Sequence, residues 1–172
     1  YGDESKITNK KDGTAIGKII IKGKDSAAMY AKNTDAINDT GAEITVKNEG
    51  SAGMYIDTDK ANITANGTNK GTITLGKDNN TEAKSSAGIL AKLGTLADKV
   101  TTITNEGEIN VKNDYAGGIV AKADYGAVIA NKNFADVTSQ NGSYIGGIAG
   151  YSKNLIKDSY MLGDVKGTDY IG

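Results

Sequence analysis

The chain has 172 residues, of which 38% are hydrophobic and 23 are glycine, and it contains no proline, cysteine, histidine or tryptophan. Its 20 basic residues, all lysine, nearly balance its 21 acidic residues, so no basic stripe favours nucleic acid or an anionic membrane as a partner. No run approaches the ~20 apolar residues of a membrane span, and zinc sites and Cys- or His-dependent nucleophiles lack their usual groups.

A short pattern, Gly or Ala followed two places later by Ile or Val, recurs along the chain at spacings of 25, 29, 36, 28 and 28 residues. Repetition with a period near thirty predicts stacked coils. Apolar residues in each copy alternate with polar residues such as Lys18 and Thr45, as in a strand with one buried face. The six copies of this predicted first strand are Gly17 with Ile19, Ala42 with Ile44, Gly71 with Ile73, Gly107 with Ile109, Ala135 with Val137, and Gly163 with Val165.

A second predicted strand places a large apolar residue between small ones, which suits the interior of a narrow tube. Its large residues are Met29, Met54, Ile89, Ile119 and Ile148. If these point inward, the next residue in each coil points outward, and stacking places such residues in a row about 4.8 Å apart. This predicted row is an apolar and aromatic strip that marks a candidate binding site, unless a neighbouring loop covers it: Tyr30, Tyr55, Leu90 and Val120.

A third predicted strand ends in Asn or Asp, residues that tolerate the left-handed backbone of a corner. We align its copies on isoleucine, with Ile63 as an irregular copy whose Asn66 comes one place late. The regular copies are Ile7 with Asn9, Ile37 with Asp39, Ile103 with Asn105, Ile129 with Asn131, and Ile156 with Asp158.

Three short strands per coil predict an all-β fold, a single-chain right-handed parallel β-helix of about six rungs and roughly 29 Å in length. Strands of a sandwich would differ in sequence, because each meets a different neighbour. We expect residues 1–172 to form one continuous segment of a longer rod, because no polar cap follows Tyr170. Residues 135–172 carry a glycine-rich variant of the repeat.

The longest rung carries two inserts, 76–85 and 93–99, before the repeat resumes at Ile103. Insertions on one side of a solenoid commonly form its binding face. The polar residues of the first insert are therefore a second candidate binding site: Asp78, Asn79, Asn80 and Glu82.

Acidic residues offer weaker possibilities. Asp57 with Asp59, or Asp35 with Asp39, could hold calcium, but the glycine-aspartate nonapeptide of calcium-binding β-rolls is absent, so we expect no metal and no cofactor. A carboxylate row of Glu108, Asp136 and Asp164 follows the first-strand repeat. The similar setting of each copy argues against one acid tuned for catalysis, and we expect no enzyme.

The segments 51–55, 86–89 and 103–113 resemble the passenger repeats of large type V autotransporter adhesins, particularly fusobacterial adhesins of the arginine-inhibitable kind. Residues 135–172, with Gly146-Gly147-Ile148-Ala149-Gly150, are similar to the GLUG repeat of bacterial surface proteins. Both motifs are degenerate and shared by many proteins.

The resemblance implies a non-enzymatic passenger segment at the cell surface, in a parent chain anchored through an outer-membrane β-barrel outside this segment. Its expected partners are bacterial or host cell-surface proteins or glycans. One alternative is a passive stalk that presents a distal binding tip. A more distant alternative is a β-helical enzyme acting on polysaccharides.

Overall fold

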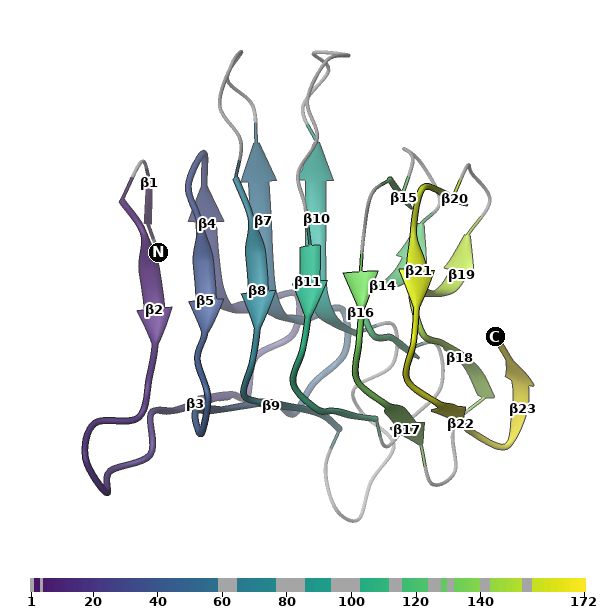
Figure 1. The fold of residues 1–172 in the computed structure, drawn as a ribbon, viewed down its shortest axis with the longest axis horizontal. Coiled ribbons are helices and arrows are strands. Elements are labelled where there is room, and N and C mark those ends of the chain that lie inside the picture. The colour runs from purple at the N-terminus through teal and green to yellow at the C-terminus, as the bar shows by residue number, and fades with distance from the viewer. Residues whose placement is uncertain are drawn as a thin grey trace.

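The computed structural model describes residues 2–3, 5–58, 65–76, 86–93, 103–111, 116–123, 128–129, 132–139, 143–152 and 156–172. In these residues the chain winds into a parallel β-solenoid of about four regular turns, with shorter strands stacked beyond them (Figure 1). The described part holds no helix that is long and apolar enough to cross a membrane.

Each regular turn contributes one strand to each of three parallel sheets, and two further strand pairs lie among the later turns. The first sheet contains β3 (Lys18–Ile21), β6 (Glu43–Val46), β9 (Thr72–Leu75), β12 (Ile109–Val111), β17 (Val137–Ser139) and β22 (Val165–Lys166). The second contains β1 (Gly2–Asp3), β4 (Ala27–Lys32), β7 (Ala52–Thr58), β10 (Ala87–Leu93), β13 (Ala116–Gly117), β18 (Ser143–Gly146) and β23 (Asp169–Ile171). The third contains β2 (Ile7–Asn9), β5 (Ala36–Asn38), β8 (Gly67–Asn69), β11 (Ile103–Asn105), β16 (Lys132–Asn133) and β21 (Tyr160–Met161). The extra pairs are β14 (Val120–Ala123) with β19 (Ala149–Ser152), and β15 (Val128–Ile129) with β20 (Ile156–Lys157).

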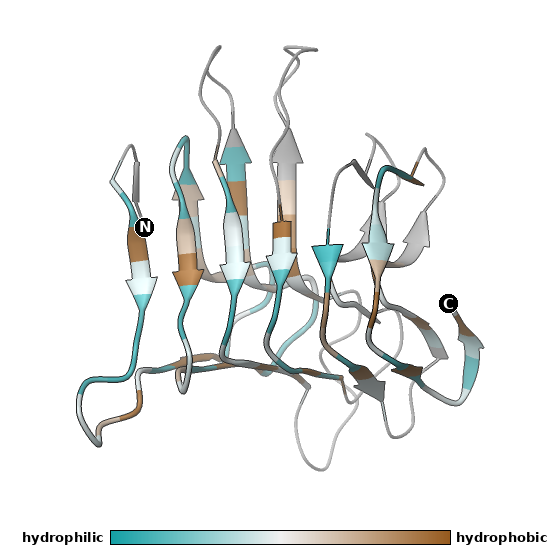
Figure 2. Cartoon of the chain, viewed as in Figure 1, coloured by the Kyte–Doolittle hydropathy of each residue, from teal (hydrophilic) through white to brown (hydrophobic). Residues whose placement is uncertain are grey.

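The first sheet has the register that the repeat predicts. Ile44 pairs with both Ile19 and Ile73, and the same column continues through Ile109 and Val137 to Val165. The strands of the third sheet β2, β5 and β11 pass from hydrophobic to hydrophilic residues along their length (Figure 2). Like residues therefore stack over like along the rod.

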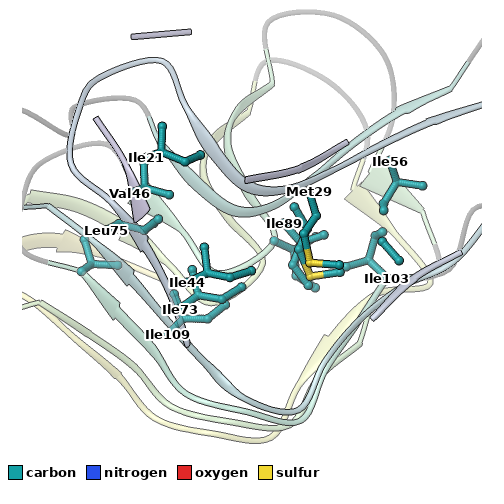
Figure 3. Close-up of a cluster of buried hydrophobic side chains, with 14 of the residues drawn as sticks. Ile21, Met29, Ile44, Val46, Ile56, Ile73, Leu75, Ile89, Ile103 and Ile109 are labelled. Carbon is teal, nitrogen blue, oxygen red and sulfur yellow. The ribbon is translucent and has the colours of Figure 1, made fainter. Parts of the chain in front are cut away.

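The core consists of these stacked columns. Ile44, Ile73 and Ile109 lie in one row and Ile21, Val46 and Leu75 in another (Figure 3). Their burial removes nearly all of each apolar side chain from water, which stabilises the fold by about 1.5–3 kcal/mol per large side chain.

The second sheet confirms the inward face predicted for its strands. Met54 pairs with Met29 and with Ile89, and all three are buried, as is Ile119. After the turn of Met29, which follows Ala28, a glycine stands just before the large residue in successive turns, where the backbones approach closely. A Cβ on Gly53 or Gly88 would lie 2.7 Å from the carbonyl oxygen of the next glycine in the stack. No larger residue fits there without moving the neighbouring turn.

The third sheet corrects the predicted register. Asn9 pairs with Asn38, not with Asp39, and Asn38 pairs in turn with Asn69, so β8 is the strand of this sheet in that turn. Ile63 lies outside the described residues. Asn105 pairs with Asn133 in place of Asn131.

The cause is that isoleucine does not mark this column. The inward residue two places before the asparagine is Ile7, Ala36, Gly67 or Ile103 in successive turns. Gly67 is small because a Cβ there would lie 2.9 Å from Cδ1 of Ile103 and 3.0 Å from Cγ1 of Ile56, which already fill the space. Ile129 belongs to β15 and pairs with Lys157, one residue away from the predicted alignment.

Candidate binding face

The predicted strip lies on the outer side of the second sheet, where β4, β7 and β10 run side by side (Figure 1). Tyr55 pairs in register with Tyr30 on one side and Leu90 on the other. The two tyrosine rings are in contact, with centroids 5.2 Å apart and planes inclined at 56°. The repeat therefore predicts the neighbours of these residues in adjacent turns, and alternation along the strand predicts their side of the sheet.

The strip is less open than simple alternation predicts. Tyr30, Tyr55 and Leu90 are each half-buried. Leu90 also packs against the buried core cluster. We name the described members Tyr30, Tyr55 and Leu90 the tyrosine strip.

A carboxylate joins the tyrosine strip through Tyr30. The Tyr30 hydroxyl donates a hydrogen bond to Oδ2 of Asp57 at 2.8 Å. This bond, together with burial and the carboxylate charge, raises the pKa of Tyr30 to about 12, while Lys32 opposes the rise. Burial, followed by the charge of Asp57, also raises the pKa of Tyr55. The strip thus presents two neutral phenols beside an acidic group that one of them holds in place.

The other predicted site residues are only partly visible. Val120 begins β14 and pairs with Ala149, but its side chain lies outside the described residues. The polar insert lies outside them altogether: Asp78, Asn79, Asn80 and Glu82. The candidate face is therefore built here from the tyrosine strip and its carboxylate.

Several of the carboxylates considered for calcium or catalysis take part in local hydrogen bonds, whereas Asp59 lies outside the described residues. Oδ1 of Asp35 accepts bonds from the backbone and side-chain nitrogens of Asn66 at 2.8 and 3.1 Å. Oδ1 of Asp136 accepts a bond from the backbone nitrogen of Asp164 at 2.8 Å. Within the described residues, no group of three or more His, Cys, Asp or Glu side chains could hold a metal ion. These contacts give the acids a role in holding turns together.

Stacked asparagines inside the tube are the main polar feature that alignment on isoleucine missed. Nδ2 of Asn9 donates to Oδ1 of Asn38 at 2.8 Å, and each following asparagine donates to the next at 2.7 Å. The last amide donates to the backbone oxygen of Gly147 at 2.7 Å. The members of this asparagine ladder are Asn9, Asn38, Asn69, Asn105 and Asn133, all buried.

The ladder satisfies the amide groups that burial would otherwise leave without partners. Its sequence signal is the recurrence of Asn itself after an outward residue, as in Thr8-Asn9, Thr68-Asn69 and Thr104-Asn105. The ladder is structural, and it fixes which residues of the third sheet face outward.

Comparison with known proteins gives one assignment. No curated protein and no solved structure matches the chain. The family model described as the BigA third pectate lyase-like domain matches residues 2–157, and the chain therefore belongs to that family.

Proposed function

We propose that the chain is a non-enzymatic segment of a bacterial surface adhesin that mediates or supports attachment to other bacteria or to host cells. It is a right-handed rod of six rungs, held at the cell surface through an outer-membrane-anchored parent of the fusobacterial autotransporter type, with GLUG-like rungs at its end. The parallel solenoid and the membership of the BigA third pectate lyase-like domain family support this proposal.

The observation that carries the proposal is the tyrosine strip. The core columns of the second sheet are complete without it, since Met29, Met54 and Ile89 fill the interior. On the outer side of the first sheet the equivalent row holds Ile20 and then polar residues such as Thr45 and Thr74. Two touching tyrosines beside a carboxylate therefore offer contact area that stacking does not require, and tyrosine is among the residues that dominate binding interfaces.

Cell binding by the purified chain tests the proposal. We expect the fluorescently labelled chain to bind target bacteria or host cells saturably, and Tyr55→Ser to weaken that binding at least tenfold. The matched control is Ile20→Thr, which replaces a 45% exposed apolar residue on the first sheet and should leave binding unchanged. Protease or glycosidase treatment of the cells then separates a protein receptor from a glycan receptor.

Two results would favour one of the alternative functions. If the chain binds no cells at saturating concentration while longer pieces of the parent do, the segment is a passive stalk. Release of reducing or unsaturated sugar ends from polysaccharides would show an enzyme instead. The hydrogen bonds that occupy Asp136 and Glu108 support the non-enzymatic function.

A further inference from the structure

The third sheet carries an apolar cluster on its outer side that interrupts the repeat. From Asp39 onward, the residue after each ladder asparagine donates its backbone N–H to the carbonyl oxygen of the asparagine in the turn before, and Leu162, which follows Met161, does the same to Asn133. These residues therefore form one column along the rod, which Lys10 begins. In the first four turns the column alternates in charge, and in the last two it becomes apolar: Lys10, Asp39, Lys70, Glu106, Phe134 and Leu162.

The residue before each ladder asparagine forms a second outward column, which Tyr160 continues in the last turn. It holds Thr8, Ile37, Thr68 and Thr104, then Lys132 and Tyr160. Figure 2 shows the chain hydrophobic just after β21, at the place where the earlier turns are hydrophilic. The first column thus changes from charged to apolar residues between β11 and β16, and in the second column Lys132 and Tyr160 follow Thr104.

The cluster is ordered by contacts among its own side chains. The rings of Phe134 and Tyr160 meet edge to face, with centroids 5.7 Å apart and planes at 84°. The Lys132 ammonium lies 5.9 Å from the centre of the Tyr160 ring, within the range of a cation–π contact. Phe134 is 40% exposed, Tyr160 41% and Leu162 71%. We name these four residues the aromatic cluster.

The exposure of Phe134 is lateral, since a turn stacks on each side of it. The backbone N–H of Phe134 donates to the carbonyl oxygen of Asn105 in the turn before. In the turn after, the N–H of Leu162 donates to the carbonyl oxygen of Asn133, the neighbour of Phe134 in the chain. Charged residues serve at the same position in four turns, so an aromatic ring there is not needed for stacking. Phe134 joins Tyr160 and Leu162 in a contiguous exposed apolar patch, the kind of surface that often marks an interaction site.

The charges around the aromatic cluster are paired within the chain. Glu106 lies 3.8 Å from Lys70, and Asp164 lies 3.4 Å from Lys166. These flanking pairs therefore add no net field that would attract a strongly charged partner, and Lys132 is the charged group of the cluster itself. A partner whose hydroxyl groups accept hydrogen bonds from that ammonium group needs no charge of its own.

The size of the cluster also limits the partner. A stable protein–protein interface takes about 20–30 residues on each side, whereas the apolar surface here comes from three residues, Phe134, Tyr160 and Leu162. One or two pyranose rings match that size. The C–H face of a neutral sugar packs on an aromatic ring, and its hydroxyl groups accept hydrogen bonds from an ammonium group.

We infer that the aromatic cluster binds neutral hexose units of a glycan, with the Phe134 and Tyr160 rings packing against the sugar and Lys132 donating to its hydroxyl groups. This site is separate from the tyrosine strip, which lies on another sheet, and it does not depend on the strip being adhesive.

Titration of the purified chain with neutral oligosaccharides of glucose, galactose and mannose tests the inference, with uronic-acid oligosaccharides and apolar peptides as competing probes. We expect calorimetric binding of at least one neutral oligosaccharide. Phe134→Ser and Tyr160→Ser should each weaken it at least tenfold, and Lys132→Met, which keeps the aliphatic stem, should weaken it several-fold.

The control Ile20→Thr should bind the oligosaccharide like the native chain. Far-UV circular dichroism of every variant checks the fold, and Lys132→Met tests the site should either aromatic variant unfold. The inference is overturned if no neutral oligosaccharide binds, if the cluster variants bind like the control, or if the acidic oligosaccharides or peptides bind in place of the neutral ones.

Discussion

Replacing Asn69 by alanine measures what the asparagine ladder contributes to stability. Asn69 is fully buried, accepts a hydrogen bond from Nδ2 of Asn38 at 2.7 Å and donates to Oδ1 of Asn105 at 2.7 Å. The substitution leaves one buried donor and one buried acceptor without partners. Each such orphan costs about 1–3 kcal/mol, so the free energy of unfolding should fall by about 2–6 kcal/mol.

Thermal and urea unfolding followed by circular dichroism measure this loss. For a chain of this size, each kcal/mol lowers the melting temperature by about 2–4 °C. The matched control is Thr68→Ala, one residue away on the outer, half-buried side of the same strand, where a change within about 0.5 kcal/mol is expected. If Asn69→Ala loses no more stability than Thr68→Ala, the ladder does not stabilise the rod and the reasoning is refuted.

Asn69→Asp adds a pH signature to the same site. The aspartate keeps the shape of the amide but turns a carboxylate oxygen toward Oδ1 of Asn105. Repulsion from Oδ1 of Asn105 and burial both raise the folded-state pKa of the aspartate above the usual ~3.9. Protonation restores the missing donor. The variant should therefore lose least stability, relative to the native chain, below about pH 4, and progressively more as the pH rises through its folded-state pKa. A loss that does not change with pH would contradict this account.

Three further changes test the faces and contacts of the second sheet. Met54→Asp buries an unpaired charge and should destabilise by several kcal/mol, whereas Tyr55→Asp, at a half-buried outer position, should lose much less in urea unfolding. Gly88→Ala places a Cβ 2.7 Å from a carbonyl oxygen of the next turn and should cost at least about 1–3 kcal/mol in the same assay. In an absorbance titration Tyr30 should ionise at about 12, and Asp57→Asn should lower that pKa toward 10.

Each of these predictions has its own control. A larger loss for Tyr55→Asp than for Met54→Asp would mean that the strand faces are reversed, and equal losses would contradict the assignment of Met54 alone to the interior. Gly172→Ala, where a Cβ meets nothing within 4 Å, should leave unfolding unchanged. Tyr30→Phe should remove the high transition, and its persistence would assign that transition to another tyrosine. The pKa of Tyr30 is higher in the folded state than its unfolded-state value of about 10. The hydrogen bond to Asp57 therefore contributes fully to the free energy of unfolding below about pH 10, and this contribution is lost as the pH rises through about 12.

The first and second sheets could be predicted from the sequence because their interior columns are marked by large apolar residues. Ile44, Ile73 and Ile109 occupy equivalent places in a narrow tube, and a shift of one residue would expose all of them. The third sheet could not be aligned in this way. Its interior column includes Ala36 and Gly67, chosen by the space that larger neighbours leave.

The surface was predictable in direction but not in detail. Alternation places Tyr30 and Tyr55 outward, but their half-burial and the bond to Asp57 depend on how the side chains pack across neighbouring turns. The aromatic cluster becomes visible in the sequence only when the turns are aligned on the ladder asparagines. Phe134 then stands where earlier turns have charged residues, and Tyr160 stands where the turn before has Lys132.

The asparagine ladder also has an evolutionary consequence. Successive members are separated by 29, 31, 36 and 28 residues, yet the amide contact stays between 2.7 and 2.8 Å. A turn can therefore gain residues at a corner while its contacts with the turns on either side remain the same. Such a chain can acquire new loops one turn at a time, and its outside can diversify while the frame that carries it is inherited intact.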